Sequence, residues 1–222
     1  MNKELIKRII TSVILIFLLG LVFFYTYILL ISLIIISLIA WIEFNSLITK
    51  IFIKKKFQTK LLRVLIKFLT LVYLSFFSVL VFNGIAQVEA NIKINIIYLF
   101  SICIISDIVG LIFGKIFEGK KLTKISPNKT ISGSIGSFFF LLLLVPVFYY
   151  IYDKIIALIS LLLLSILVSL SCQLGDLFIS YLKRKAKVKD TGDLLPGHGG
   201  VLDRIDGILF AIPMGVILWQ FL

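Results

Sequence analysis

Long apolar runs separated by short charged stretches form the first pattern along the chain. Each run approaches the roughly 20 residues that an α-helix needs to cross the hydrocarbon layer of a membrane. The runs cover residues 9–26, 27–46, 61–82, 94–114, 134–152, 155–178 and 205–222. The pattern predicts an all-α fold, a polytopic integral membrane helical bundle with about seven transmembrane helices.

The first two runs adjoin without a polar break. No charged residue lies between Arg8 and Glu43, which is too long for one crossing, so we expect a tight hairpin near residues 25–28. Lys3, Lys7 and Arg8 precede the first run, but no short apolar core with an A-x-A cleavage site follows them. We therefore expect a retained first span and not a cleaved signal peptide.

Composition excludes a water-soluble globule. The chain is 60% hydrophobic and 15% charged, with a mean hydropathy of +1.15, whereas soluble domains are about 45–50% apolar and about 25% charged. We expect an N-terminal part with three spans at residues 1–92. A second part at residues 93–222 has polar loops at 115–133 and 179–204, where most of the chemistry-bearing residues lie.

The placement of the cations predicts the orientation. The net charge is +12, and 20 of the 23 Lys and Arg residues fall on one side of a seven-span arrangement. By the positive-inside rule that side is the cytoplasm, with the N-terminus inside and the C-terminus outside. The cluster Lys54–Lys56 has a simpler interpretation, because topology signals and attraction to anionic lipids need the same residues.

Carboxylates in or beside the spans are costly, so each is a candidate functional residue. They gather toward the cytoplasmic ends of their helices, under the basic face, whereas a transporter more naturally places its ionisable groups at the midplane. Such a cluster indicates a site for a cytosolic anion with bound metal. For Glu43, beside Trp41 and Asn45, interfacial anchoring is as reasonable as catalysis. The other members are Asp107, Asp176, Asp203 and Asp206.

Spacing groups these acids with phosphate-binding cations. Asp203 and Asp206 share a helix face at a spacing of three, and hard carboxylate oxygens suit Mg²⁺. Asp176, Ser180 and the pair Lys183–Arg184 recur at helical spacing, which gives a stripe with a carboxylate and cations. An ordinary intramembrane salt bridge between Asp176 and a neighbouring Lys remains the alternative.

A glycine-dense polar stretch at residues 189–200 cannot remain helical. Gly197, Gly199 and Gly200 allow backbone N–H groups to approach an anion closely. His198 is the only histidine in the chain. A hydrogen-bonded loop residue, a metal ligand and a general base are open interpretations of it.

A second polar island lies at residues 114–136. Lys side chains and small donors at a helix entry can hold phosphate oxygens. A plain loop with an N-terminal helix cap is the alternative, and Gly110-x-x-x-Gly114 is also an ordinary helix-packing motif.

These residues together resemble the signature of the phosphatidate cytidylyltransferase (CDP-diacylglycerol synthase) family. The likeness covers about residues 100–210. It rests on Ser106-Asp107-x-x-Gly110-x3-Gly114-Lys115, Ser126-Pro127-x-Lys129-Thr130-x-x-Gly133-x-x-Gly136, Ser171-x-Gln173-x-Gly175-Asp176 and Ser180-x-x-Lys183-Arg184-x4-Lys189-Asp190-x-Gly192-x2-Leu195-Pro196-Gly197-His198-Gly199-Gly200-x-x-Asp203-Arg204-x-Asp206. The chain departs from the family in three places. Ile131-Ser132 stands where Trp-Glu is usual, Asp193 replaces a usual Asn, and Ile179 occupies a place that is often acidic.

The resemblance implies transfer of the cytidylyl group of CTP to phosphatidate, which yields CDP-diacylglycerol and pyrophosphate. It implies a two-metal centre, with Mg²⁺ and a second ion that is divalent or monovalent, held by Asp176, Asp203 and Asp206. The catalytic residues it implies are Asp176, Lys183, Arg184, Lys189, Asp190, His198, Asp203, Arg204 and Asp206. The substrate-binding residues it implies are Asp107, Lys115, Lys121, Ser126, Lys129, Thr130, Ser180, Gly197, Gly199 and Gly200.

The implied partners are CTP, phosphatidate, membrane lipids and a second copy in a homodimer, with no nucleic acid. The implied location is the bacterial inner membrane, with the active site facing the cytoplasm. A CTP-dependent polyprenol or dolichol-type lipid kinase and an ion-coupled transporter stay open as alternatives. CDP-alcohol phosphatidyltransferases are excluded, because Asp206-Gly207 is not followed by the x2-Ala-Arg of their motif.

Overall fold

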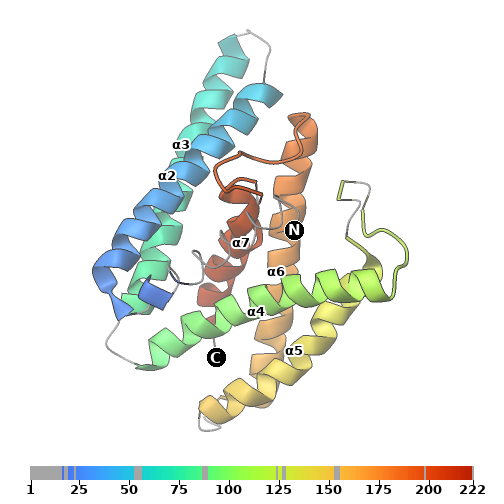
Figure 1. The fold of residues 1–222 in the computed structure, drawn as a ribbon. Helices are drawn as coiled ribbons and strands as arrows, with labels where there is room; N and C mark the ends of the chain where they lie inside the picture. The colour runs from blue at the N-terminus through green and yellow to red at the C-terminus, as the bar shows by residue number, and fades with distance from the viewer. Residues whose placement is uncertain are drawn as a thin grey trace. The chain divides into compact units, whose positions relative to one another are not determined.

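The described part of the chain is helical and contains no strand. A computed structural model describes residues 17, 20–22, 24–52, 57–86, 90–123, 125–126, 129–152, 156–197 and 199–221. Its helices are α2 (Thr26–Ile51), α3 (Phe57–Ala86), α4 (Ala90–Ile116), α5 (Ile131–Ile151), α6 (Leu158–Lys185) and α7 (Leu202–Trp219) (Figure 1).

These helices confirm the predicted all-α polytopic membrane bundle. Within the described ranges, α2 through α6 are long and apolar enough to cross a membrane. The sixth, α7, occupies the last predicted span and carries Asp203 and Asp206 near its start. The first predicted span, residues 9–26, falls largely outside the described residues.

The helix is interrupted at Tyr25, within the segment 25–28 where a tight hairpin is predicted, and the hairpin itself stays a prediction. This residue precedes α2 with extended backbone angles, φ −125° and ψ 105°. Its N–H still donates to the carbonyl of Leu21 (3.0 Å), so helical hydrogen bonding reaches it from the preceding residues. The chain therefore interrupts its apolar stretch where one continuous helix would be too long for a single crossing.

The chain divides into two compact units, which we describe separately. Unit 1 comprises residues 1–86 and 182–205, and unit 2 comprises residues 87–181 and 206–222. Both α6 and α7 contribute to each unit, because the division falls within these helices.

Unit 1 contains the helix pair α2 and α3, which lie side by side (Figure 1). The hydroxyls of Ser37 and Ser78 are 2.6 Å apart, and the Trp41 indole N–H donates to the carbonyl of Lys67 (3.0 Å). Such bonds are useful between membrane helices, since lipid is as apolar as the side chains and drives little helix association.

Unit 2 is held by close packing of α4 against α5. A Cβ atom added at Gly133 would overlap the backbone carbonyl of Gly110, and one added at Gly136 would lie 2.5 Å from the ring of Phe113. The simpler interpretation of Gly110 and Gly114 as packing residues is thus confirmed, because both face the start of α5.

A ladder of polar side chains joins α6 to its neighbours inside unit 2. The Tyr98 hydroxyl lies 2.5 Å from that of Ser165, and Ser106 lies 2.9 Å from Ser169. The amide of Gln173 donates to Ser137 (3.0 Å). Each buried polar group thereby has a partner, as a helix in a membrane requires.

Candidate functional site

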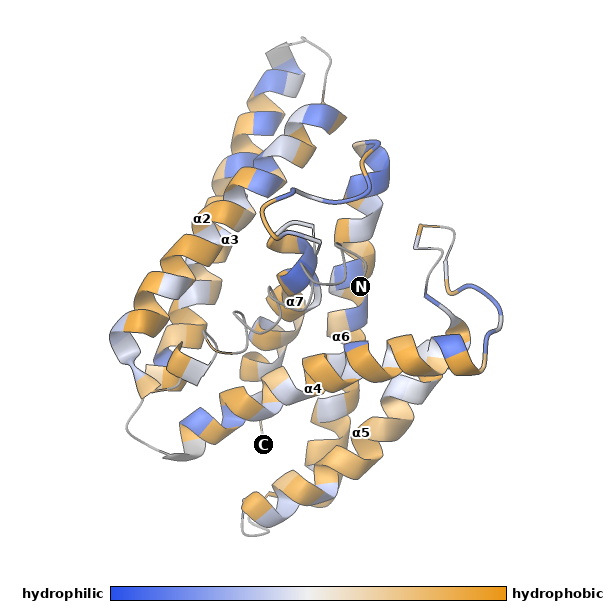
Figure 2. Cartoon of the chain, in the orientation of Figure 1, coloured by the Kyte–Doolittle hydropathy of each residue, from blue (hydrophilic) through white to orange (hydrophobic). Residues whose placement is uncertain are grey.

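The loop between α6 and α7, residues 186–201, is the main polar region of unit 1 (Figure 2). As predicted, it is not helical. Gly197 and Gly199 take φ values of 77° and 82°, which favour glycine. The N–H of Leu195 donates to the carbonyl of Gly199 (2.9 Å) and closes a tight turn. The predicted His198 lies outside the described residues.

Asp203, in the first turn of α7, organises the end of this loop. One carboxylate oxygen lies 2.6 Å from the ammonium of Lys183. The other accepts the N–H groups of Thr191 (2.8 Å) and Gly200 (3.1 Å). Burial alone would raise the pKa of Asp203, but these donors lower it below its ordinary value. Asp203 is therefore held as a carboxylate.

Glu43 reaches the same loop from α2. It is only 7% exposed. Its carboxylate accepts the N–H groups of Val201 (3.0 Å) and Leu202 (2.9 Å) and the hydroxyl of Thr191 (2.7 Å). Interfacial anchoring and catalysis are the two sequence-based interpretations of Glu43, and neither predicts a contact with this loop. Any residue except proline offers a backbone N–H group, so the sequence does not show which ones Glu43 binds. The only indication in the sequence is that an acid lies in a mainly apolar helix.

A hollow of about 540 Å³ opens on the loop in unit 1. Its walls combine cations, carboxylates and glycines, which is the composition expected for a phosphate-bearing ligand. It is lined by Lys189, Asp190, Asp193, Leu195, Gly197, Gly199 and Arg204. Five of these residues belong to the predicted site. Gly200 is buried beside the same loop, and Arg184 lies exposed near the end of α6.

A second charged cluster lies in unit 2. Lys129, in the α4–α5 loop, forms an ion pair with Asp176 of α6. The hydroxyl of Ser180 donates to the same carboxylate (3.2 Å). Burial opposes a charge on Lys129, yet the carboxylates of Asp176, Asp107 and Asp206 raise the pKa of its ammonium above the ordinary value. The predicted alternative for Asp176, a salt bridge, is thus present, and its partner is Lys129.

The remaining predicted residues of unit 2 lie at the ends of α4 and α5. Thr130 caps α5, because its side chain accepts the N–H of Gly133 (3.1 Å). Lys121 pairs with Thr130 through an isolated bridge. The N–H of Ser126 donates to Thr123 (3.2 Å), and Lys115 is exposed at the end of α4. The cap interpretation of this island is confirmed for Thr130.

Ser132 stands where the resembled family usually has Glu. Its hydroxyl donates to the carbonyl of Glu118 (2.8 Å) and contacts Thr130 (3.0 Å). The serine thus closes the α4–α5 loop onto α5 with neutral hydrogen bonds.

The carboxylates provide hard oxygen donors for a cation. In unit 2, Asp107, Asp176 and Asp206 act on one ammonium group, that of Lys129. Among the described residues, no three His, Cys, Asp or Glu side chains gather closely enough to hold a metal ion alone. Mg²⁺ commonly binds one or two carboxylates and takes its other ligands from substrate phosphates and water, so the donor set fits in kind.

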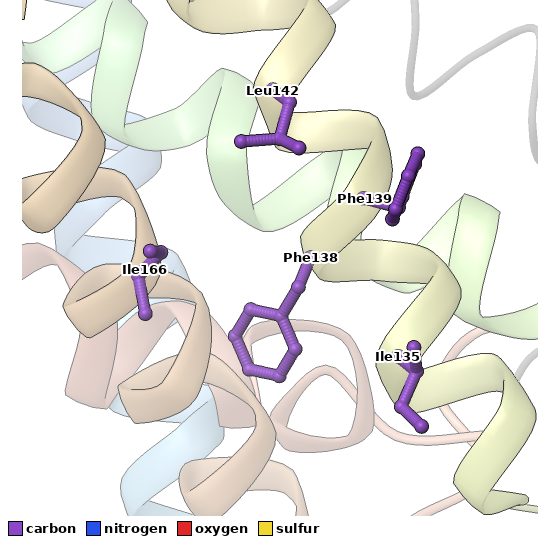
Figure 3. A pocket seen from close by; sticks show the side chains of 5 residues that line it. All are labelled: Ile135, Phe138, Phe139, Leu142 and Ile166. Atoms are coloured by element: carbon purple, nitrogen blue, oxygen red, sulfur yellow. The ribbon is translucent and has the colours of Figure 1, made fainter.

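An apolar hollow of about 300 Å³ lies between α5 and α6 in unit 2. Figure 3 shows Phe138 and Ile166 in the space between these helices, with Phe139 on the outer side of α5. The lining is completed by Ile135 and Leu142. A hydrocarbon chain suits such a surface.

The fold and these clusters define a class of protein. It is an all-helical polytopic membrane protein with clusters of charged residues around the α4–α5 and α6–α7 loops. The chain belongs to the cytidylyltransferase family, whose pattern matches residues 3–222.

Curated relatives are similar over part of the chain. The phosphatidate cytidylyltransferase of Bacillus subtilis is 39% identical over 138 residues, which are 60% of this chain and 51% of that protein. That of Rickettsia typhi is 41% identical over 150 residues, 62% of each chain. That of Staphylococcus haemolyticus is 43% identical over 124 residues, 55% of this chain and 48% of that protein. The chain thus covers less than two thirds of each relative's length.

Proposed function

We propose that this protein transfers the cytidylyl group of CTP to phosphatidate and releases pyrophosphate. The observation that carries the proposal is the hollow on the glycine-rich loop, with Lys189 and Arg204 in its wall and Asp203 fixed beneath the same loop by four hydrogen-bond contacts. Family membership and the names of the relatives support it.

The reaction needs charge neutralisation more than covalent help from the protein. A phosphate oxygen of phosphatidate attacks the α-phosphorus of CTP, and the bond to the β-phosphate oxygen breaks, so pyrophosphate leaves. In this proposal Lys189, Arg204 and Arg184 bind phosphate oxygens. Lys183 holds Asp203 in place, and the backbone at Gly197–Gly200 approaches the nucleotide closely.

Metal ions bound by aspartate side chains are a further part of the proposal. In this proposal Asp176 and Asp206 of unit 2 and, separately, Asp203 of unit 1 would supply carboxylate oxygens to Mg²⁺ and a second ion, which would neutralise charge on phosphate groups. Lys129 already supplies a positive charge next to Asp176. The lipid chains remain in the bilayer, and the apolar hollow beside Phe138 offers them a surface on unit 2.

The protein's setting belongs to the same proposal. In this proposal the site lies at the cytoplasmic face of a bacterial inner membrane, where CTP is present. The basic loops support this orientation through the positive-inside rule. A homodimer, implied by the family resemblance, is tested by chemical cross-linking in intact membranes.

The deciding experiment incubates the purified protein with radiolabelled CTP, phosphatidate and Mg²⁺. We expect labelled CDP-lipid and pyrophosphate in equal amounts, and no product when Mg²⁺ is chelated. Asp203→Asn should lower turnover by at least about 100-fold, since an amide cannot replace a carboxylate that takes donors on both oxygens.

Lys60→Ala, a change at an exposed cation of α3, is the matched control and should retain full turnover. Release of CDP with a phosphorylated lipid would show a lipid kinase instead. Ion flux without any use of CTP would show a transporter. Either result overturns the proposal.

A further inference from the structure

Glu43 is a buried acid outside the part of the chain that resembles the family signature. It lies on α2, a mainly apolar helix, shortly before Asn45 and Ser46. All three of its partners are donors, namely Val201 N–H, Leu202 N–H and the Thr191 hydroxyl. A carboxylate so buried is expensive unless donors compensate it, so these bonds explain why it is tolerated.

The contact is built at the N-terminus of α7. The first N–H groups of a helix have no partner inside the helix. Here Glu43, from a different helix, accepts two of them, at Val201 and Leu202. The negative charge also lies at the positive end of the α7 dipole. Glu43 thus fixes where α7 begins, one residue before Asp203.

Two glycines make room for the carboxylate. A Cβ atom at Gly192 would lie 2.7 Å from Glu43 Oε1. One at Gly200 would overlap Glu43 Oε2 and the Thr191 hydroxyl. The loop therefore wraps around Glu43 at a distance that no other residue at these two positions permits without displacement.

Thr191 connects Glu43 to Asp203. Its hydroxyl lies 2.7 Å from Glu43 Oε2 and 3.0 Å from Asp203 Oδ2. Its N–H donates to the same Asp203 oxygen (2.8 Å). A shift of the loop away from Glu43 would therefore move donors of Asp203 as well.

We propose that Glu43 is a positioning residue, which fixes the α6–α7 loop and the start of α7 so that Asp203 keeps its orientation during turnover. Its effect on turnover rests on the proposed function, whereas its hold on the loop does not. The helix pair α2 and α3 then contributes to the position of Asp203, because Glu43 of α2 binds the α6–α7 loop.

The first test is Glu43→Gln in the full-length protein. The amide has the same shape, but its NH₂ group must face at least one of the donors, so the contact is broken. We expect the backbone amide that faces this NH₂ group, that of Val201 or that of Leu202, to exchange with deuterium at least about 10-fold faster, because it loses its acceptor. Turnover should fall about 10- to 100-fold, with the KM for CTP within about 3-fold of the unmodified value, since misplacement acts on the reacting geometry.

Thr191 provides the second test and guards against a variant that fails to fold. Thr191→Ser keeps the hydroxyl and should retain turnover and slow exchange. Thr191→Val lacks it and should behave like Glu43→Gln. If the contact served only the stability of the fold, Glu43→Gln and Thr191→Val would not lower kcat at a nearly unchanged KM. Retained turnover in Thr191→Ser would show that the hydroxyl is the group that matters.

Ser37→Ala is the matched control, because it removes a polar contact of α2 with α3 away from the loop. It should leave loop exchange and turnover unchanged. Unchanged exchange at residues 201–202 in Glu43→Gln would overturn the inference. So would faster exchange with full turnover. If the unmodified protein makes no CDP-lipid, the proposed function fails, and the exchange experiment still decides whether Glu43 holds the loop.

Discussion

At the scale of single residues, two carboxylates of unit 1 are each compensated by several hydrogen-bond donors. Glu43 and Asp203 are both carboxylates that accept backbone N–H groups of the α6–α7 loop. Lys129 presents the reverse case, with one ammonium near several carboxylates. Because charge in an apolar protein is costly, each of these groups restrains the backbone or side chains around it.

The lowered pKa of Asp203 predicts how stability depends on acidity. A depressed pKa contributes stability that is present above the ordinary value of 3.8 and is lost as the pH falls through the lower folded value. We therefore expect the difference in thermal unfolding midpoint between the unmodified protein and Asp203→Asn to stay constant from about pH 8 to pH 5.

That difference should shrink only at pH values below 3.8. Unfolding followed by intrinsic fluorescence in detergent measures it. A difference that already shrinks near neutral pH would show that the donors around Asp203 do not lower its pKa.

At the scale of elements, backbone contact between α4 and α5 brings the polar island to its place. Gly110 and Gly133 allow the two helices to approach closely. Thr130 starts α5 and Lys129 precedes it, so the position of Lys129 beside Asp176 depends on this packing. Small residues at such crossings are a common device in membrane bundles.

We predict that Gly133→Ala destabilises unit 2. The added Cβ would overlap the Gly110 carbonyl, and both atoms belong to helix backbones that cannot move cheaply. The expected loss is about 1–3 kcal/mol, as for overpacking in other cores. Thermal unfolding in detergent measures it.

Gly20→Ala is the matched control. Nothing lies within 4 Å of a Cβ at Gly20, and alanine is intrinsically favoured over glycine in a helix by about 1 kcal/mol. This variant should be neutral or slightly more stable. Equal behaviour of the two variants would contradict the packing argument.

At the scale of the whole molecule, the chain leaves unit 1 at residue 86 and returns to it at residue 182. The polar loops that carry the site residues, 117–130 and 186–201, both follow helices with basic last turns. From the sequence alone, the positive-inside rule predicts that both loops face the cytoplasm.

Reporter fusions test this arrangement. With an odd number of crossings, a reporter after Leu222 should be active outside the cytoplasm, and reporters inserted near Lys121 and Lys187 should be active inside. Insertions near Ala157, at the opposite end of α5 and α6, provide the comparison. A reporter after Leu222 that is active in the cytoplasm would contradict the seven-span topology.

Much of the fold was predictable from hydropathy, because each long apolar run in the described ranges became a helix. The ends were less predictable. The run at 155–178 ends where charges begin, yet α6 continues to Lys185, since cations suit the C-terminal end of a helix. The acids and glycines of the loop marked the site. The ion pair of Lys129 with Asp176 depends on how the helices pack. The hydrogen bonds of Glu43 depend on backbone N–H groups. Neither contact could be predicted from the residues next to it in the sequence.

The contact of Glu43 with Val201 has a consequence for how the protein is made, because the two residues are 158 positions apart. At a synthesis rate of about 5–20 residues per second, roughly 8–30 s separate them on the ribosome. The helix that carries Glu43 is thus made well before the three groups that hold its carboxylate. A nascent chain stopped before Gly200 lacks two of the three donors of this carboxylate, the N–H groups of Val201 and Leu202, so the cost of burying the charge is not yet compensated.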